Sequence, residues 1–382
     1  MKLQKFSYVQ FGGQPPEWKV DDFILGQINL IVGRNAVGKT RLLNVINHLG
    51  KLLSGEIKEL DYNGRFEAYF EDGSETWVYD VKYDASEIIN ETLLYNGNDV
   101  MRRGLAGIGI IEAEEIEGKA VRMRFQTPLR QLGVVAKRDS IQHPYLEGLY
   151  EWGHALRHFQ FGYEMRPHTL AYRIAANGLN NQIDEKDTTS LVPIFDLAIR
   201  QSYGEELKRT VMADMETLGY HITELGIRKP EHTVVEGFMM GELVGVYAKE
   251  QDLDAITDQP NMSQGMFRTL SLLIQTTHYM MSKKSGCILI DDIGEGLDFE
   301  RSCILIDLLR EKAKQSTFQL IMSTNNRFVM NRVPLEEWCV LERTKGNVRV
   351  RNYANSAAAF EAFKITGLSN FDLFATNFLE GK

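Results

Sequence analysis

Short runs in which apolar and polar residues alternate fill much of the first half of the chain. They span residues 65–70, 76–83 and 121–125, and the segment 71–74 between the first two reads Glu-Asp-Gly-Ser. A period of two places the apolar side chains on one face of a strand, and turn residues between two such runs favour a hairpin. The first half is therefore predicted to hold an antiparallel sheet.

Continuous apolar runs occur elsewhere in the chain. Residues 28–32 and 287–290 are almost wholly apolar, and residues 319–324 form a similar strand-like run. Such runs are typical of strands that are buried on both faces, as in a parallel sheet covered by helices. The chain is predicted to be an α/β protein.

Helical spacing of apolar residues follows the first of these runs. The apolar positions recur at i, i+3, i+4 and i+7, namely Leu42, Val45, Ile46 and Leu49. Gly50 is expected to end this helix. Two further helical patterns are present. One begins at Pro144, and the other spans residues 191–218.

Length and pattern together predict three regions. The 382 residues suffice for two or three domains, or for one large α/β domain with an insertion. We predict one lobe over residues 1–180, a small helical insert over 181–250 and a second lobe over 251–382. None of the apolar runs approaches the ~18 residues that a membrane-spanning helix needs.

Charge and cysteine content narrow the class of protein. The chain has 43 Lys and Arg against 52 Asp and Glu, a net charge of −9. Its three cysteines, Cys287, Cys303 and Cys339, lie in apolar surroundings without C-x-x-C spacing. We expect reduced core thiols in a cytosolic protein, without disulfides or a cysteine-ligated zinc ion.

One segment predicts a phosphate-binding loop. Eight residues fit the pattern G-x-x-x-x-G-K-[ST], and they are Gly33, Arg34, Asn35, Ala36, Val37, Gly38, Lys39 and Thr40. They follow a predicted strand and precede a predicted helix, which is the context that this motif requires. Backbone N–H groups of the loop would cradle the phosphates at the start of the helix. Lys39 would reach the β- and γ-phosphates, and Thr40 would bind Mg²⁺.

A pair of acids follows the second buried run. Asp291 and Asp292 come directly after residues 287–290, and Gly294-Glu295-Gly296-Leu297-Asp298 comes next. Mg²⁺ prefers oxygen ligands, so we assign Asp291 to the metal. Asp292 would polarise the water that attacks the γ-phosphate.

Four motifs in this order resemble those of ABC-type ATPases. They are the phosphate loop, Met262-Ser263-Gln264-Gly265-Met266-Phe267-Arg268, the acidic strand, and Gly296-Leu297-Asp298. In that family they are the Walker A loop, the signature, Walker B and the D-loop. The resemblance is greatest to the soluble branch that includes RecF, SMC and OLD-family proteins. It implies a P-loop fold with a mixed sheet, an antiparallel β subdomain and a small helical insert, and it implies ATP and Mg²⁺ as cofactors.

The resemblance also implies a homodimer that sandwiches two ATP molecules. Ser263, Gln264 and Gly265 would open a helix and contact ATP held by the other subunit, and Asp298 would also contribute to nucleotide binding. The alternative for Ser263 is that it only caps its own helix, because serine is common at that position.

The chain departs from the family pattern at two catalytic positions. Asp292 stands where the family usually has Glu, and the loss of one methylene pulls the carboxylate back by roughly 1.5 Å, enough to cost about a hundredfold in rate if uncorrected. Asn325 stands where the resemblance implies a histidine, and we expect it to sense the γ-phosphate. The family's magnesium-shell glutamine has three candidates, Gln126, Gln131 and Gln142, of which we favour Gln142.

The leading interpretation is an ATP-hydrolysing dimer that acts as a switch or motor for a separate effector, a nuclease or toxin. The resemblance places such proteins in DNA repair or anti-phage defence. The alternative is a nucleotide-gated scaffold for DNA or protein with little hydrolysis. The distance from Thr40 to Ser263 leaves no room for long coiled-coil arms, and a membrane-transporter subunit is disfavoured by the form of the motifs.

A basic segment is the candidate DNA contact. From Lys119 to Arg173 there are nine Lys and Arg against four Asp and Glu. Such an excess can form a local phosphate-binding groove in a chain whose overall charge is negative. A solvated surface without a partner is the alternative.

Overall fold

The computed structural model describes residues 1–58, 60, 62–114, 120–162, 165–174, 178–179, 183–231 and 242–380. The chain forms two compact units. Unit 1 comprises Met1–Leu156, Ser285–Leu289 and Thr317–Lys382, and unit 2 comprises Arg157–Lys284 and Ile290–Ser316. Within the described ranges, every helix is too short or too polar to cross a membrane.

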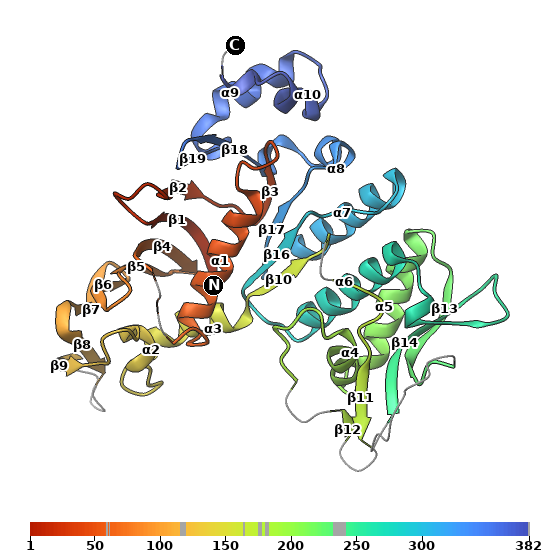
Figure 1. Cartoon of the computed structure of the whole chain (residues 1–382), viewed down its shortest axis with the longest axis horizontal. Helices are drawn as coiled ribbons and strands as arrows, with labels where there is room; N and C mark the ends of the chain where they lie inside the picture. The colour runs from red at the N-terminus through yellow and green to blue at the C-terminus, as the bar shows by residue number, and fades with distance from the viewer. Residues whose placement is uncertain are drawn as a thin grey trace. The chain divides into compact units, whose positions relative to one another are not determined.

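Unit 1 is built on a large mixed sheet (Figure 1). Its strands are β1 (Lys2–Gln10), β2 (Trp18–Ile24), β3 (Ile28–Val32), β4 (Gly64–Asp72), β5 (Glu75–Tyr83), β6 (Ile88–Tyr95), β7 (Asn98–Arg103), β8 (Ile108–Glu114), β9 (Ala120–Gln126), β16 (Cys287–Asp291), β17 (Gln319–Ser323), β18 (Trp338–Thr344) and β19 (Asn347–Asn352). Their order is β16-β17-β3-β18-β19-β2-β1-β4-β5-β6-β7-β8-β9. The last two residues of β16 belong to unit 2.

The parallel and antiparallel parts of this sheet separate along its length. Strand β3 pairs in parallel with both β17 and β18, whereas β1 and the strands from β4 to β9 form an antiparallel meander. All five residues of β3 are buried, and β4 buries every second residue over most of its length. The antiparallel sheet and the hairpin turn at residues 71–74 are confirmed, with Asp72 paired to Glu75 across Gly73.

The core of unit 1 lies between this sheet and two helices, α1 (Lys39–Leu53) and α3 (Glu147–Ala155). The predicted apolar face of α1 is buried. The sequence predicted that α1 ends at Gly50, but the helix continues to Leu53. A Cβ on Gly153 would lie 2.4 Å from the Gly50 carbonyl oxygen, so the two glycines allow α1 and α3 to pack closely.

The remaining helices of unit 1 are α2 (Gly133–Ala136), α8 (Arg327–Arg332), α9 (Tyr353–Ile365) and α10 (Asn370–Ala375), with 3₁₀ turns η1 (Leu105–Gly107), η2 (Pro144–Leu146), η4 (Leu335–Glu337) and η5 (Phe378–Glu380). The helix predicted after Pro144 is thus confirmed as η2 followed by α3. Helix α10 contacts both α8 and η5. The C-terminal helices therefore pack on the part of unit 1 that carries β17 to β19.

Unit 2 contains helices and a small sheet. The helices are α4 (Leu191–Ile199), α5 (Gly204–Thr217), α6 (Gln264–Met281) and α7 (Phe299–Lys314), with η3 (Gln259–Asn261). The sheet has the order β12-β11-β14-β13, with β15 on β14. These strands are β11 (Ala171–Ile174), β12 (Gly178–Leu179), β13 (Ile222–Arg228), β14 (Glu242–Glu250) and β15 (Ile256–Asp258). The unit also includes β10 (Arg157–Gln160), which neighbours β16.

The segment predicted as a helical insert is only half helical. Helices α4 and α5 lie within the predicted helical stretch, but β13 and β14 follow them. Residues 181–182 and 232–241 lie outside the described part of the insert. A buried ion pair fixes the helices, because Lys312 Nζ lies 2.7 Å from Asp214 Oδ2 and donates to Thr277 Oγ1 at 3.2 Å. This pair joins α5, α6 and α7.

Two of the three cysteines are core thiols as expected. Cys287 and Cys339 are buried, and burial raises the pKa of both thiols. Cys303 on α7 is only half-buried, so the expectation of a core position is wrong for this residue. None of the three forms a disulfide among the described residues.

Candidate functional site

The predicted phosphate loop leaves β3 and enters α1 with a backbone that depends on glycine. A Cβ at Gly33 would lie 2.8 Å from Val37 Cγ1, and Gly38 has a φ of 112°. Ala36 also has a positive φ, 64°. Left-handed residues of this kind curl the chain so that N–H groups converge on one point. The loop leads directly into the N-terminus of a 15-residue helix, which adds a positive dipole end.

Lys39 is held in place under this loop. Its side chain is buried, with 7% exposure, and its Nζ donates to the Gly33 carbonyl oxygen at 2.9 Å and to Asn325 Oδ1 at 2.7 Å. A buried ammonium needs such acceptors, because the loss of water is otherwise costly. The Lys39 side chain is therefore held close to the loop in which phosphates would lie.

Asn325 reaches Lys39 because β17 runs beside β3. Residue 325 follows β17, and the Thr324 N–H donates to the Ile31 carbonyl at 3.3 Å. The next residue, Asn326, caps α8 by accepting from the Phe328 N–H at 2.9 Å. The structure thus brings Lys39 and Asn325 together, although the sequence patterns that predicted them are unrelated.

The two oxygen donors predicted for Mg²⁺ in unit 1 are far apart. Thr40 is exposed in the first turn of α1. Gln142 is exposed after α2, where its carbonyl accepts from the Glu114 N–H at the end of β8. Strand β8 lies nine strands from β3, roughly 40 Å along the sheet at about 4.8 Å per strand (Figure 1). The structure does not bring Gln142 to Thr40, so our choice among the glutamines was wrong.

In unit 2 the two acids at the end of β16 have different surroundings. Asp291 is buried, and its carbonyl accepts from the Phe161 N–H at 3.1 Å. Asp292 is half-buried and has a φ of 52°, a left-handed conformation that aspartate tolerates better than most residues. A Cβ on Gly162 would lie 3.3 Å from Asp292 Cβ. The turn thus sends the Asp292 side chain away from the direction that an extended strand would give it.

A glutamine that sequence reasoning missed ends the strand beside these acids. Gln160 is the last residue of β10, which neighbours β16, and the residue after it donates to Asp291. The alternation of buried Phe159 and Phe161 around a half-buried Gln160 was the available signal. A four-residue strand is too short for that alternation to stand out.

The predicted signature opens α6. Ser263 is its N-cap, accepting from the Met266 N–H at 3.2 Å, and both Ser263 and Gln264 are exposed. Gly265 packs on the D-loop, since a Cβ there would lie 3.1 Å from Leu297 Cδ2. The start of α6 is therefore a solvent-accessible helix N-terminus supported by the loop after β16.

Arg268 holds the signature helix to two loops of unit 2. Its Nη2 donates to the Gly162 carbonyl at 2.7 Å and its Nη1 donates to the Glu295 carbonyl at 3.2 Å. Burial lowers the pKa of its guanidinium, but arginine stays protonated at any physiological pH. This side chain ties the start of α6 to the loops after β10 and β16.

Asp298 has a structural role that its motif did not reveal. It is the N-cap of α7, accepting from the Arg301 N–H at 2.9 Å, and Arg301 Nη1 lies 2.7 Å from its other oxygen. The backbone hydrogen bond is the main reason that the pKa of this carboxyl is lowered. Arg301 also donates to the Leu218 carbonyl and stacks on Tyr220. The D-loop is thereby fixed to the end of α5.

The hydroxyl of Thr40 and the carboxylate of Asp291 could supply only part of the coordination of a Mg²⁺ ion. The hydroxyl of Thr40 and the carboxylate of Asp291 are oxygen donors of the kind that the ion prefers. Over the described residues, no three His, Cys, Asp or Glu side chains cluster closely enough to hold a metal ion. Nucleotide phosphate oxygens and water would have to complete the coordination, as is usual for Mg²⁺.

The basic segment is divided between the two units. Residues 120–156 belong to unit 1 and residues 157–173 belong to unit 2, while Lys119 and residues 163–164 lie outside the described residues. Arg138 pairs with Glu147 at 2.9 Å, and Arg157 is buried beside Glu185. Part of the basic charge is therefore neutralised inside the chain.

Comparison with known proteins shows that the fold is similar to that of SMC head domains. No protein-family model matches the sequence, and no curated protein matches it. Among solved structures, an Smc head bound to the C-winged helix domain of ScpA has a TM-score of 0.50 and 15% identity, over 92% of this chain and 97% of that chain.

Two further SMC head structures are similar over most of the chain. An Smc head domain with an extended coiled coil, bound to the C-terminal domain of ScpA derived from Pyrococcus furiosus, has a TM-score of 0.49 and 12% identity, over 95% of this chain and 99% of that chain. The SMC head domain from Thermotoga maritima has a TM-score of 0.42 and 13% identity, over 92% and 99%. The strand order and the likeness to the first of these three structures confirm the predicted mixed α/β fold.

Proposed function

We propose that this protein binds and hydrolyses ATP, and that ATP joins two copies head to tail. The observation that carries the proposal is the phosphate loop with Lys39 already seated in it. A buried ammonium, a glycine-dependent loop and a helix N-terminus converge there, and together they form a triphosphate cradle. The ABC-type fold gives this cradle its expected surroundings.

The chain's own residues divide the chemistry of hydrolysis. Lys39 would neutralise the β- and γ-phosphates, and Asn325 would monitor the γ-phosphate beside it. Mg²⁺, when bound with Thr40 and Asp291, would withdraw charge from the phosphates. Asp292 would orient the attacking water and accept its proton. Gln160 replaces Gln142 as our proposed magnesium-shell residue, since it ends the strand next to Asp291.

Dimerisation is supported by the exposed start of α6. Ser263 accepts a hydrogen bond from Met266, and its hydroxyl proton can still be donated to a phosphate oxygen. Gly265 adds a backbone N–H near the helix end. The segment 262–268 contains no lysine, so this second anion site would bind a nucleotide that another copy already holds.

The test combines ATP turnover with mass in solution. Lys39→Ala should lose ATP binding and turnover, whereas Lys51→Ala, an exposed lysine at the other end of α1, should retain both. Ser263→Arg should bind ATP but lose the ATP-dependent doubling of mass, and Ser202→Arg, an exposed serine elsewhere in unit 2, should keep it. Equal turnover in Lys39→Ala and wild type would contradict the ATPase proposal.

A nucleotide-gated scaffold is the second candidate, favoured by Asp292 and Asn325 at the two catalytic positions. Tight ATP binding and mass doubling without turnover would select it. In either case we propose that the output passes to a separate effector in DNA repair or anti-phage defence. Stimulation by duplex DNA that weakens steeply with salt would support the DNA contact, and a flat salt response would exclude it.

A further inference from the structure

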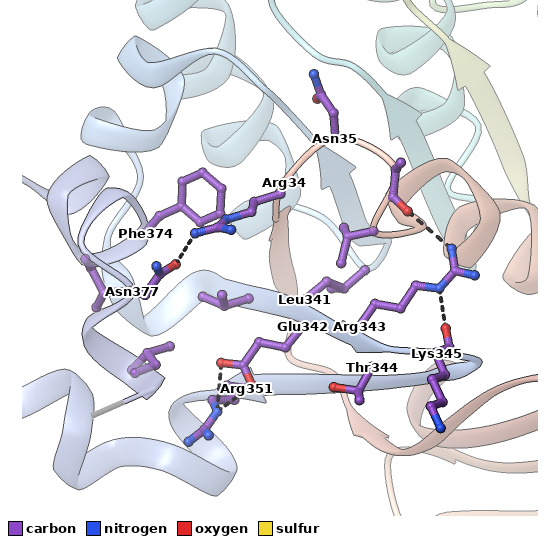
Figure 2. Close-up of a pocket in the computed structure, with 15 residues that line it drawn as sticks. Arg34, Asn35, Leu341, Glu342, Arg343, Thr344, Lys345, Arg351, Phe374 and Asn377 are labelled. Carbon is purple, nitrogen blue, oxygen red and sulfur yellow. Dashed lines mark hydrogen bonds and ion pairs between the residues drawn. The ribbon is translucent and has the colours of Figure 1, made fainter. Parts of the chain in front are cut away.

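A pocket of about 740 Å³ lies in unit 1 beside the phosphate loop (Figure 2). Residues 34–37, the β18–β19 hairpin and the segment from α10 to η5 form its walls. This volume is typical of small-molecule sites. Lys39 and Thr40, which we expect to hold the ATP phosphates and Mg²⁺, do not line it. The pocket therefore shares residues 34–37 with the phosphate loop, but it does not include the two side chains that we expect to contact the phosphates and Mg²⁺.

The pocket has an excess of positive charge. Arg34, Arg343, Lys345 and Arg351 line it with one carboxylate, Glu342. Glu342 is already paired with Arg351 at 3.0 Å. Within the described parts of the chain, the other three cations have no carboxylate at ion-pair distance. In a protein with a net charge of −9, this local excess attracts anions.

Neutral acceptors hold the two unpaired guanidiniums in position. Arg34 Nη2 donates to Asn377 Oδ1 at 2.8 Å. Arg343 Nε donates to the Lys345 carbonyl at 2.7 Å, and its Nη1 donates to the Ala36 carbonyl at 3.3 Å. Figure 2 shows these bonds on opposite sides of the pocket. The guanidiniums are preorganised while their charge remains uncompensated, which suits the bidentate binding of an anionic group.

Apolar side chains also line the pocket, beside the polar Asn35, Thr344 and Asn377. Val37, Leu341 and Leu373 are buried side chains of the wall. Phe374 on α10 is half-buried and, like Arg34, lines the pocket (Figure 2). A flat apolar group could therefore pack against the ring while a phosphate meets the guanidiniums.

We propose that this pocket binds a small phosphate-bearing molecule with a flat apolar body, and that its occupancy alters ATP affinity. Arg34 belongs to the phosphate loop, and Arg343 bonds to the loop carbonyl of Ala36. A ligand that engages both arginines must therefore act on the loop that cradles ATP. The coupling to ATP rests on the proposed function, whereas the binding site does not.

The first experiment measures binding of 4-methylumbelliferyl phosphate by equilibrium dialysis, with Lys39→Ala used to disable the ATP site. One probe molecule should bind per chain. The double variant Arg34→Gln/Arg343→Gln should weaken binding about tenfold, since charge-assisted bonds are lost. Phe374→Ala should also weaken it, and Arg349→Gln on the same hairpin, outside the pocket, should not. No binding, or equal binding in all variants, would overturn the proposal.

Competition distinguishes other occupants of the pocket. Inorganic phosphate should compete with the probe, and 4-methylumbelliferone, which lacks the phosphate, should compete poorly. Displacement by ATP in Lys39→Ala, whose ATP site is disabled, would show that the nucleotide itself enters the pocket. Displacement only when ATP doubles the mass would show that a second copy fills it. Either result would overturn the proposal.

The second experiment measures coupling. Saturating probe should change the KM for ATP in wild type at least about twofold, and it should not do so in Arg34→Gln. Binding of the probe without a change in the KM for ATP would overturn the proposed coupling, but the proposed binding site would stand. If wild type shows no ATP turnover, the proposed function fails, but dialysis still decides whether the pocket binds the probe.

Discussion

The phosphate loop in unit 1 and the start of α6 in unit 2 are both helix N-termini suited to anions, yet they differ in what supports them. Lys39 is buried and bonded to Gly33 and Asn325, so the first site combines a cradle with a cation. Ser263 and Gln264 are exposed, and Ser263 caps its own helix. From this difference we expect the first site to hold a nucleotide by itself, whereas the second would only complete a site that another copy provides.

The largest effect should come from a residue of unit 2 that acts on bound ATP. Asp292→Asn removes the proposed base and should lower turnover about a hundredfold or more, while ATP binding persists. Rapid-quench assays and nucleotide dialysis on the same preparation separate the two quantities. Glu295→Gln, an exposed acid of the same loop, is the matched control. A twofold effect or less would remove Asp292 from the mechanism.

The turnover rates of the Gln160→Ala and Gln142→Ala variants should differ by about tenfold. Gln160→Ala should lower turnover and raise the Mg²⁺ concentration required for half-maximal rate, because a ligand contact in the metal shell is lost. Gln142→Ala should change neither. A Mg²⁺ titration of both variants makes the comparison. Equal Mg²⁺ dependence in the two variants would show that Gln160 does not belong to the magnesium shell.

Asn325→Ala should have a smaller effect on the phosphate loop. Lys39 then loses a 2.7 Å acceptor, and the sensing amide near the γ-phosphate is absent. We expect a few-fold loss of ATP affinity, about 1 kcal/mol, with ADP affinity less affected. Calorimetric titration with both nucleotides measures the difference. Asn44→Ala, an exposed asparagine of α1, is the control, and unchanged ATP affinity and turnover in Asn325→Ala would refute the sensing role.

The smallest effect should separate the two roles of Ser263. Ser263→Ala removes the N-cap of α6 and should lower the free energy of unfolding by about 1 kcal/mol. Ser263→Asp should keep the cap, because aspartate is a strong N-cap residue, but its charge should repel a phosphate. Urea unfolding and ATP-dependent mass are measured in parallel. A stable Ser263→Asp protein that still doubles in mass would leave Ser263 with the capping role alone.

Local sequence patterns predicted much of the fold. Alternation identified β4 and β5, and the apolar run with its glycine loop identified β3 and α1. These signals work because side-chain periodicity and turn chemistry are local. β13 and β14 were missed, and they follow two helices within the segment that was predicted to be a helical insert.

The sequence predicted most residues of the candidate site, but it did not predict which of them contact one another. Lys39 and Asn325 are 286 residues apart, and no local pattern can show that the pairing of β17 with β3 joins them. Gln160 was missed for the same reason, because its place depends on the neighbour of β10 in the sheet. Gly50 was taken for a helix end, since only the packing of α3 reveals its use.

The three cysteines give this protein a single convenient attachment point for a reporter. Thiolates are the reactive form, and burial raises the pKa of Cys287 and Cys339. A maleimide dye should therefore modify Cys303 first, without any engineered substitution. Cys303 lies in the second turn of α7, close in sequence to Asp298. Fluorescence anisotropy of such a dye would follow the D-loop region in real time as ATP is added.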